Sequence, residues 1–135
     1  MSERDGLIVC FGRTVSESCS TAMQLTADSC PDLNLQFVMS DWLAEDQIRG
    51  GTIYWVLDST AELRDIRIAL QHGIPMLVPE QAQALKEVCI EGNCGLFYQN
   101  LEEAVACLTY LVRHPAVRAV LSDNARRFLE PGRPP

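Results

Sequence analysis

The stretch GIPMLVPEQAQALKEVCIEGNCGLFY, residues 73–98, decides the fold of this chain. Its apolar run 76–78 is short and continuous, which is typical of a strand buried on both faces, and residues 94–98 predict a second strand. Residues 80–90 between them have the spacing of a helix. We therefore expect a strand–helix–strand unit whose turn and capping residues are Gly73, Pro75, Gly92 and Gly95.

The same alternation continues in both directions from this stretch. Three further apolar runs, residues 7–11, 33–39 and 52–57, predict strands. Helices are expected between the strands, and three of them start at capping sequences, at residues 14–17, 59–62 and 100–103. A short helix, capped by Asp41 and ending at Ile48, continues the pattern. A last helix from Pro115, carrying Val117, Val120, Leu121 and Phe128, completes it.

Strict alternation of strands and helices predicts the class of fold. We expect an α/β protein, a three-layer Rossmann-like sandwich with a mostly parallel sheet of about five strands. At 135 residues the chain has the size of one domain, expected over residues 1–130, with the proline-rich residues 131–135 as a flexible tail. In such sheets ligands bind at the carboxyl ends of the strands.

The charge balance and the short apolar runs limit the possible partners. The net charge is −7 and the isoelectric point is near 4.7, which opposes binding to nucleic acid or anionic membranes. No apolar stretch is long enough to span a bilayer, and the charged start of the chain does not resemble a secretion signal. The sequence therefore predicts a cytoplasmic protein without a membrane span.

Six cysteines could indicate disulfides or a metal site, but their spacing favours neither. No C-x-x-C pair occurs, and the two histidines, His72 and His114, fall at expected helix ends. Cys10 lies in an apolar strand and Cys107 in an apolar helix. We interpret the cysteines as small core residues and expect no bound metal.

Several common catalytic motifs are missing from the sequence. No G-x-G-x-x-G follows the first strand, and the chain has no phosphate-binding G-x-x-x-x-G-K-[ST] loop and no G-x-S-x-G nucleophile turn. Dinucleotide-binding, P-loop and serine-hydrolase functions therefore lack their central feature.

Other motifs occur in an order that resembles a known family. Gly12-Arg13 follows the first strand, Ser59 to Glu62 has the pattern S-x-x-E, and Glu87-Val88 precedes a G-x-x-G-L turn. In this order the chain resembles the C-terminal, nucleotide-sugar-binding domain of GT-B fold glycosyltransferases of the group 1 type. The resemblance implies a nucleotide-sugar ligand, no cofactor or metal, and a donor-binding set of Gly12, Arg13, Ser59, Glu62, Glu80 and Glu87.

The chain departs from the family pattern where the donor phosphates and ribose would be held. Ser18 replaces the lysine that partners the arginine, and Ile68 replaces the second glutamate of the pair. Residues 63–65 and 81–83 carry side chains where the family has glycines that approach phosphate. Gly12-Arg13 can equally be a strand-to-helix turn with a solvated arginine, and the pattern Ser59 to Glu62 favours a helix cap over donor binding.

Three functional hypotheses follow from this mixture. The first is a degenerate, glycosyltransferase-like domain that is not catalytic alone and acts as an accessory or interaction module in glycan or surface-polysaccharide synthesis. The second is the donor-binding half of an active glycosyltransferase, completed by another domain or chain. The third is a receiver-like signalling domain with Asp58 as phosphoacceptor, which labelling by acetyl phosphate would test; it lacks the acidic residues expected after the first strand.

Overall fold

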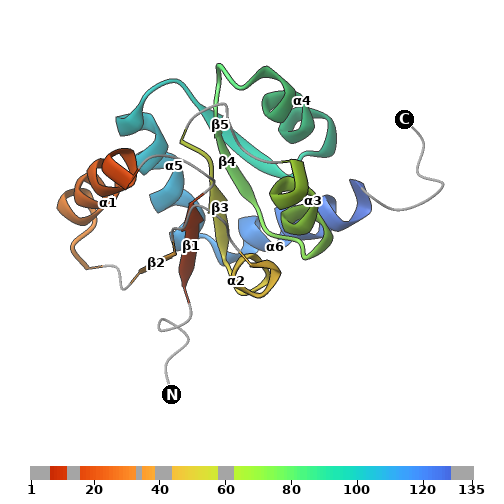
Figure 1. Cartoon of the computed structure of the whole chain (residues 1–135), viewed down its shortest axis with the longest axis horizontal. Coiled ribbons are helices and arrows are strands. Elements are labelled where there is room, and N and C mark those ends of the chain that lie inside the picture. Colours follow the sequence, from red (N-terminus) through yellow and green to blue (C-terminus); the bar gives the residue numbers. More distant parts are fainter. Residues whose placement is uncertain (1–6, 12–15, 33–34, 39–43, 58–62, 129–135) are drawn as a thin grey trace.

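The computed structural model describes residues 7–11, 16–32, 35–38, 44–57 and 63–128. Five parallel strands form one sheet in the order β2-β1-β3-β4-β5, with β5 at one edge (Figure 1). The strands are β1 (Ile8–Phe11), β2 (Gln36–Val38), β3 (Ile53–Trp55), β4 (Met76–Pro79) and β5 (Gly95–Tyr98). This is a doubly wound order: β2 is added on one side of β1, and β3, β4 and β5 are added on the other side.

Helices alternate with these strands as the sequence predicts. They are α1 (Ser16–Ser29), α2 (Glu45–Arg49), α3 (Leu63–Gln71), α4 (Gln83–Gly92), α5 (Leu101–Arg113) and α6 (Pro115–Phe128). The sheet lies between two helical layers, with α1 and α5 on one side and α2, α3 and α4 on the other (Figure 1). The expected α/β three-layer sandwich is therefore confirmed.

Side chains of successive strand residues point into two different cores. Tyr54 and Met76 pack with α2, α3 and α4, whereas Trp55 and Leu77 pack with α1 and α5. Helix α6 contributes to both cores, because it follows α5 and continues past α3 and α4. The strands are thus buried on both faces, which is why they appear in the sequence as continuous apolar runs.

The helix expected at 80–90 begins later, at Gln83. The backbone amide of Glu80 continues the sheet by donating to the Tyr98 carbonyl oxygen at 2.7 Å. Ala82 then donates to the Pro79 carbonyl oxygen at 3.0 Å and closes a turn. Residues 80–82 therefore belong to the strand end and its turn, and the helix gains its last residues at Glu91 and Gly92 instead.

Only one of the three glycines expected to serve turns has a turn conformation. Gly73 has a φ of +66°, as its position after α3 predicts, but the left-handed residue after α4 is Asn93, with a φ of 49°. Gly92 is instead the last residue of α4, where an added Cβ would lie 2.9 Å from the Phe128 ring. Gly95 begins β5 against the β4 backbone. Gly92 and Gly95 are therefore needed because a side chain at either position would lie too close to its neighbours.

The apolar residues expected in the last helix lie within α6, and all but Val120 are at least partly buried. Leu121 is buried and Val117 and Phe128 are partly buried, whereas Val120 is 55% exposed. Val120 lies one residue before Leu121, about 100° around the helix, which turns it away from the core.

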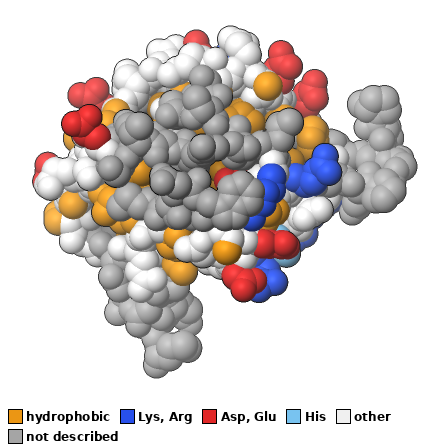
Figure 2. Space-filling model, viewed as in Figure 1, with side chains coloured by type: hydrophobic (Ala, Val, Ile, Leu, Met, Phe, Trp, Pro, Cys, Tyr) orange, Lys and Arg blue, Asp and Glu red, His pale blue; other side chains and the backbone are white. Residues whose placement is uncertain are grey.

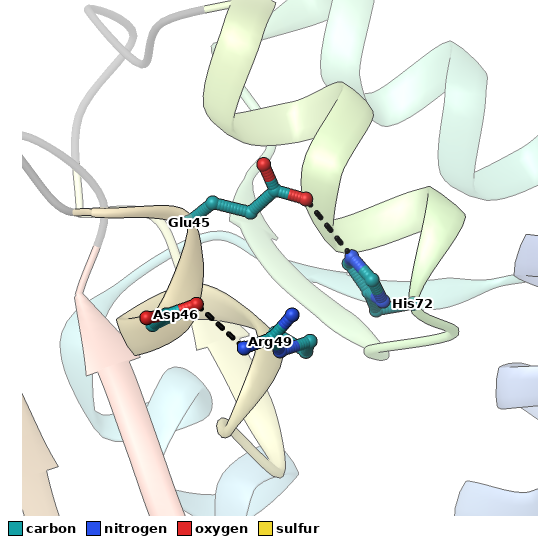
Figure 3. Close-up of polar contacts among 4 residues, drawn as sticks. All are labelled: Glu45, Asp46, Arg49 and His72. Carbon is teal, nitrogen blue, oxygen red and sulfur yellow. Dashed lines mark hydrogen bonds and ion pairs between the residues drawn. The ribbon is translucent and has the colours of Figure 1, made fainter.

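Helix α2 is linked to the end of α3 at the surface (Figure 3). Glu45 Oε2 lies 3.3 Å from His72 Nε2, and Asp46 pairs with Arg49 within α2. The pairs are largely solvent-exposed, so each contributes at most about 1 kcal/mol. Ile48, which is fully buried under α2, holds this short helix in place more strongly.

All six cysteines are free thiols, and five are buried as the core interpretation predicts; Cys107 is only partly buried. Burial raises the pKa of Cys10 to about 11. Burial, with the neighbouring Cys94, raises the pKa of Cys89 to about 12.

Thiol labelling tests this arrangement. Because the thiolate is the reactive form, Ellman's reagent at pH 8 should find at most one rapidly reacting thiol in the native protein, Cys107, and all six in denaturant. Cys107→Ser should remove the rapid phase. Two or more rapidly reacting thiols in the folded protein would contradict the buried placement.

Candidate functional site

A depression of about 320 Å³ lies at the carboxyl ends of the strands. Leu57 follows β3, Gln81 follows β4, and Gln99 follows β5 at its rim. The described residues that line it are Thr21, Leu57, Gln81, Tyr98, Gln99, Asn100 and Leu101. This is the edge where a doubly wound sheet binds ligands, and the depression is the candidate site.

The start of α5 at this edge is closed by the chain's own side chains. Asn100 Oδ1 accepts a hydrogen bond from the Glu103 amide at 2.8 Å, and Glu103 Oε1 accepts one from the Gln99 amide at 2.6 Å. This confirms the cap predicted at residues 100–103. These two amides are therefore engaged, and the Glu103 carboxylate lies where a ligand phosphate would approach.

The hydrogen bond from the Glu103 amide to Asn100 should contribute to the stability of the protein. Asn100→Ala should lower the free energy of unfolding by about 1 kcal/mol, because the Glu103 amide loses its acceptor. Asn100→Asp should retain nearly all of the stability, since aspartate caps as well as asparagine. Urea unfolding of the wild-type protein and the two variants measures these changes. Equal losses in both variants would show that the capping hydrogen bond does not determine the stability contributed by Asn100.

The first turn of α3 holds a second carboxylate. Asp65 is only 3% exposed, and its Oδ1 lies 2.6 Å from Nη1 of the adjacent Arg64. Burial, and next the charge of Asp65, raise the pKa of Tyr54 on β3. Asp65 therefore points inward toward the sheet, at a position where the family pattern would have a bare glycine amide.

The residue before α4, Ala82, occupies the N-cap position and provides no side-chain hydrogen bond to the helix. Glu80, just before it, is partly exposed and accepts a hydrogen bond from Gln99 Nε2 at 3.2 Å. Glu87 lies further along α4 on its exposed surface and does not line the depression. The structure thus places Glu80 at the rim of the candidate site and Glu87 away from it.

The remaining predicted donor-binding residues are Gly12, Arg13, Ser59 and Glu62, and all four lie outside the described residues. Ser18 falls within α1, and Ile68, which replaces the family glutamate, is 8% exposed and packs into the core under α3. Position 68 is therefore a core position in this chain.

In the view of Figure 2, basic side chains gather near α3, away from the start of α5, and a further one lies lower, near α2. Arg64 and Arg67 line a separate groove on α3 with Ile68 and Gln71. Among the described residues that line the candidate site, none carries a charge. Beside these lining residues, Glu80 and Glu103 each accept a hydrogen bond from Gln99 and carry negative charge.

None of the seven described lining residues belongs to the donor-binding set predicted from the sequence. Thr21 projects from an exposed part of α1, where a polar residue carries no distinctive pattern. Asn100 was predicted only as a cap, and Gln81 only as a replaced glycine. The rule that ligands bind beyond the strand ends would have selected Gln81 and Asn100.

Within the described ranges, no three His, Cys, Asp or Glu side chains come together as a possible metal site. In the same ranges no single helix has the length and apolar character to cross a membrane. Helices α5 and α6 reach that length and composition only when taken together, and they are bent by 98° relative to each other.

The fold is shared with glycosyltransferase structures of the GT-B type. A structure described as the glycotransferase of kitacinnamycin matches with a TM-score of 0.66 and 15% identity, over 96% of this chain and 40% of that one. The C-terminal CMP-Kdo-binding domain of WaaA from Acinetobacter baumannii matches with a TM-score of 0.68 and 12% identity, over 93% of this chain and 90% of that domain. No family model and no curated protein sequence matches the chain.

These similarities confirm the fold that the motifs predicted, that of a GT-B C-terminal domain. The chain spans about 40% of the length of the kitacinnamycin enzyme and nearly the full length of the WaaA domain. Identity is low in both cases, so the residues of the site decide what this chain binds.

Proposed function

We propose that this chain is a cytoplasmic, single-domain, glycosyltransferase-like module that does not transfer sugar by itself. It serves as an accessory or interaction module in glycan synthesis. The observation that carries the proposal is the placement of carboxylates at two helix starts, Asp65 in α3 and Glu103 in α5. A carboxylate at a helix start disfavours a second anionic group there.

Electrostatics give this observation its weight. A phosphate and a carboxylate 4 Å apart repel by about 4 kcal/mol at an effective dielectric constant of 20. Arg64 already pairs with Asp65, so the positive charge of Arg64 is largely compensated and attracts a phosphate only weakly. Ile68 also lacks the oxygen atoms that the family glutamate would direct toward a ribose. Binding of a sugar nucleotide should therefore be weak.

Calorimetry tests the proposal directly. Titration with UDP-glucose, GDP-mannose, ADP-glucose and a CMP-linked sugar should give dissociation constants weaker than about 1 mM. Micromolar binding of any one of them would overturn the accessory role and restore a donor site.

The second candidate is the donor-binding half of an active transferase completed by another domain or chain. Its support is the match over 90% of a domain whose description names CMP-Kdo binding. Arg13 and Glu62 would then line the donor site, whereas Glu87, predicted with them, lies on α4 outside the depression. Arg13→Ala should abolish sugar-nucleotide binding without unfolding the protein, and unchanged binding would reject this role for Arg13.

A further inference from the structure

The candidate depression presents uncharged hydrogen-bonding groups above an apolar floor. Its polar lining consists of the hydroxyl of Thr21 and the side-chain amides of Gln81, Gln99 and Asn100, and Leu57 and Leu101 supply aliphatic surface. Tyr98 is buried, and its hydroxyl donates to the Val56 carbonyl oxygen, so it supports the floor without a free polar group.

Gln99 is held from two directions. Its backbone amide donates to Glu103 Oε1 at 2.6 Å, and its side-chain Nε2 donates to Glu80 Oε1 at 3.2 Å. A carboxylate can only accept hydrogen bonds, so the amide orientation of Gln99 is determined and Oε1 is the end left to accept. The two flanking carboxylates thus position Gln99.

Asn100 is oriented in the opposite sense. Its Oδ1 accepts from the Glu103 amide, which leaves the Nδ2 hydrogens to donate. The hydroxyl of Thr21 donates to the Glu17 carbonyl oxygen at 3.1 Å, so its lone pairs remain to accept. The depression therefore has a fixed donor, two fixed acceptors, and in Gln81 a group that can do both.

We propose that this depression binds an uncharged carbohydrate, through one or two sugar residues of a glycan chain. Sugar hydroxyls donate and accept at the same oxygen, so they match a lining of oriented amides and a hydroxyl, and their C–H faces suit Leu57 and Leu101. The volume of about 320 Å³ lies at the small end of the roughly 300–1,000 Å³ typical of small-molecule sites. The inference rests on the proposed function, because it takes the site to have lost its sugar-nucleotide donor.

Two other occupants fit the site less well. An anionic ligand would meet Glu80 and Glu103 without a compensating basic side chain among the described lining residues. A nucleobase binds best by stacking on an exposed aromatic ring or guanidinium plane. The one aromatic residue described in the lining is Tyr98, which is only 4% exposed.

NMR titration can test the proposal at the residues concerned. The full chain, labelled with ¹⁵N, is titrated with maltotriose, chitotriose and mannobiose, and in parallel with UDP-glucose, CMP-sialic acid, uridine and cytidine. We expect at least one neutral oligosaccharide to shift the side-chain NH₂ signals of Gln81 and Asn100 in a saturable way. The nucleosides and sugar nucleotides should leave them unchanged.

Two variants with a matched control sharpen the test. Asn100→Asp retains the cap but removes the Nδ2 donor, and Gln81→Ala removes a group that both donates and accepts; each should weaken oligosaccharide binding about tenfold or more. Gln71→Ala, which changes an exposed glutamine on the other side of the molecule, should leave binding unchanged.

The outcomes separate this inference from the proposed function. If no oligosaccharide and no sugar nucleotide binds, the carbohydrate site is rejected and the accessory role stands. If a sugar nucleotide binds with micromolar affinity, both are rejected. Saturable binding of the nucleosides alone would identify the depression as a base site and reject the carbohydrate proposal.

Discussion

Replacing Gly95 by alanine should lower the free energy of unfolding by about 2–4 kcal/mol. An added Cβ would lie 2.5 Å from the Met76 carbonyl oxygen and 2.9 Å from Cys89 Sγ. The first of these contacts cannot relax through a rotamer change, because Met76 is a backbone partner of Gly95 in the pairing of β4 with β5. The strands would have to separate. Urea unfolding followed by circular dichroism measures the loss.

Gly50→Ala is the matched control for this prediction. Gly50 has a φ of −79°, and an added Cβ would come no closer than 3.5 Å to another atom, so its stability should change by less than about 0.5 kcal/mol. A second variant separates the two contacts at Gly95. Cys89→Ala combined with Gly95→Ala relieves the sulfur contact alone, so a full rescue would show that the strand backbone is not the obstacle.

The role of Gly95 shows what the sequence can and cannot predict about this fold. Gly92 and Gly95 have the spacing of a turn, and a turn does occur there, but Asn93 adopts the left-handed conformation. The space occupied by Phe128 from α6 and by the β4 backbone is set by contacts distant in the sequence. A local pattern therefore placed the turn correctly and assigned the wrong physical reason to its glycines.

Most strands and helices followed from local patterns because each pattern reflects burial against the sheet. The buried positions Ile66, Ala69 and Leu70 have helical spacing, and they form the inner face of α3. The start of α4 did not follow, since the Glu80 amide is engaged by Tyr98 of a strand formed later in the chain.

The candidate site could be predicted in part. The cap formed by Asn100 and Glu103 is local, so its sequence pattern specifies it fully. The inward placement of Asp65 and the bond between Glu80 and Gln99 depend on how separate elements meet. Replacement of the family glycines predicted a weakened phosphate site, but the structure was needed to show carboxylates at two of the helix starts.

The fold and the proposed functions depend on different residues of this chain. The sheet requires apolar strands and close approach of β4 to β5, and these features persist together with the GT-B architecture. The strand ends tolerate substitution because they lie at the surface. Substitutions at the carboxyl edge can therefore alter which ligands bind there while the scaffold retains its stability.

Trp55→Ala should cost about 3–5 kcal/mol of stability, the largest effect of any side-chain truncation considered for this protein. Trp55 lies in the central part of the sheet, is fully buried, and packs against Phe11 with ring centroids 5.2 Å apart. Its loss would leave a cavity between the sheet and helices α1 and α5, which can collapse very little. Val120→Ala, at an exposed position, should change stability by less than about 0.5 kcal/mol.

Trp55→Phe should be much less harmful than its loss of volume suggests. The indole Nε1 is buried and has no hydrogen-bond partner within the described part of the chain, and such a group costs about 1–3 kcal/mol. Phenylalanine removes that cost while keeping an aromatic ring against Phe11. We therefore expect Trp55→Phe to lose less than half of what Trp55→Ala loses in urea unfolding, with similar m-values. Equal losses in the two variants would contradict this prediction, because they would mean that the indole nitrogen is satisfied in the folded protein and that its interaction, not the packing of the ring, determines the stability contributed by Trp55.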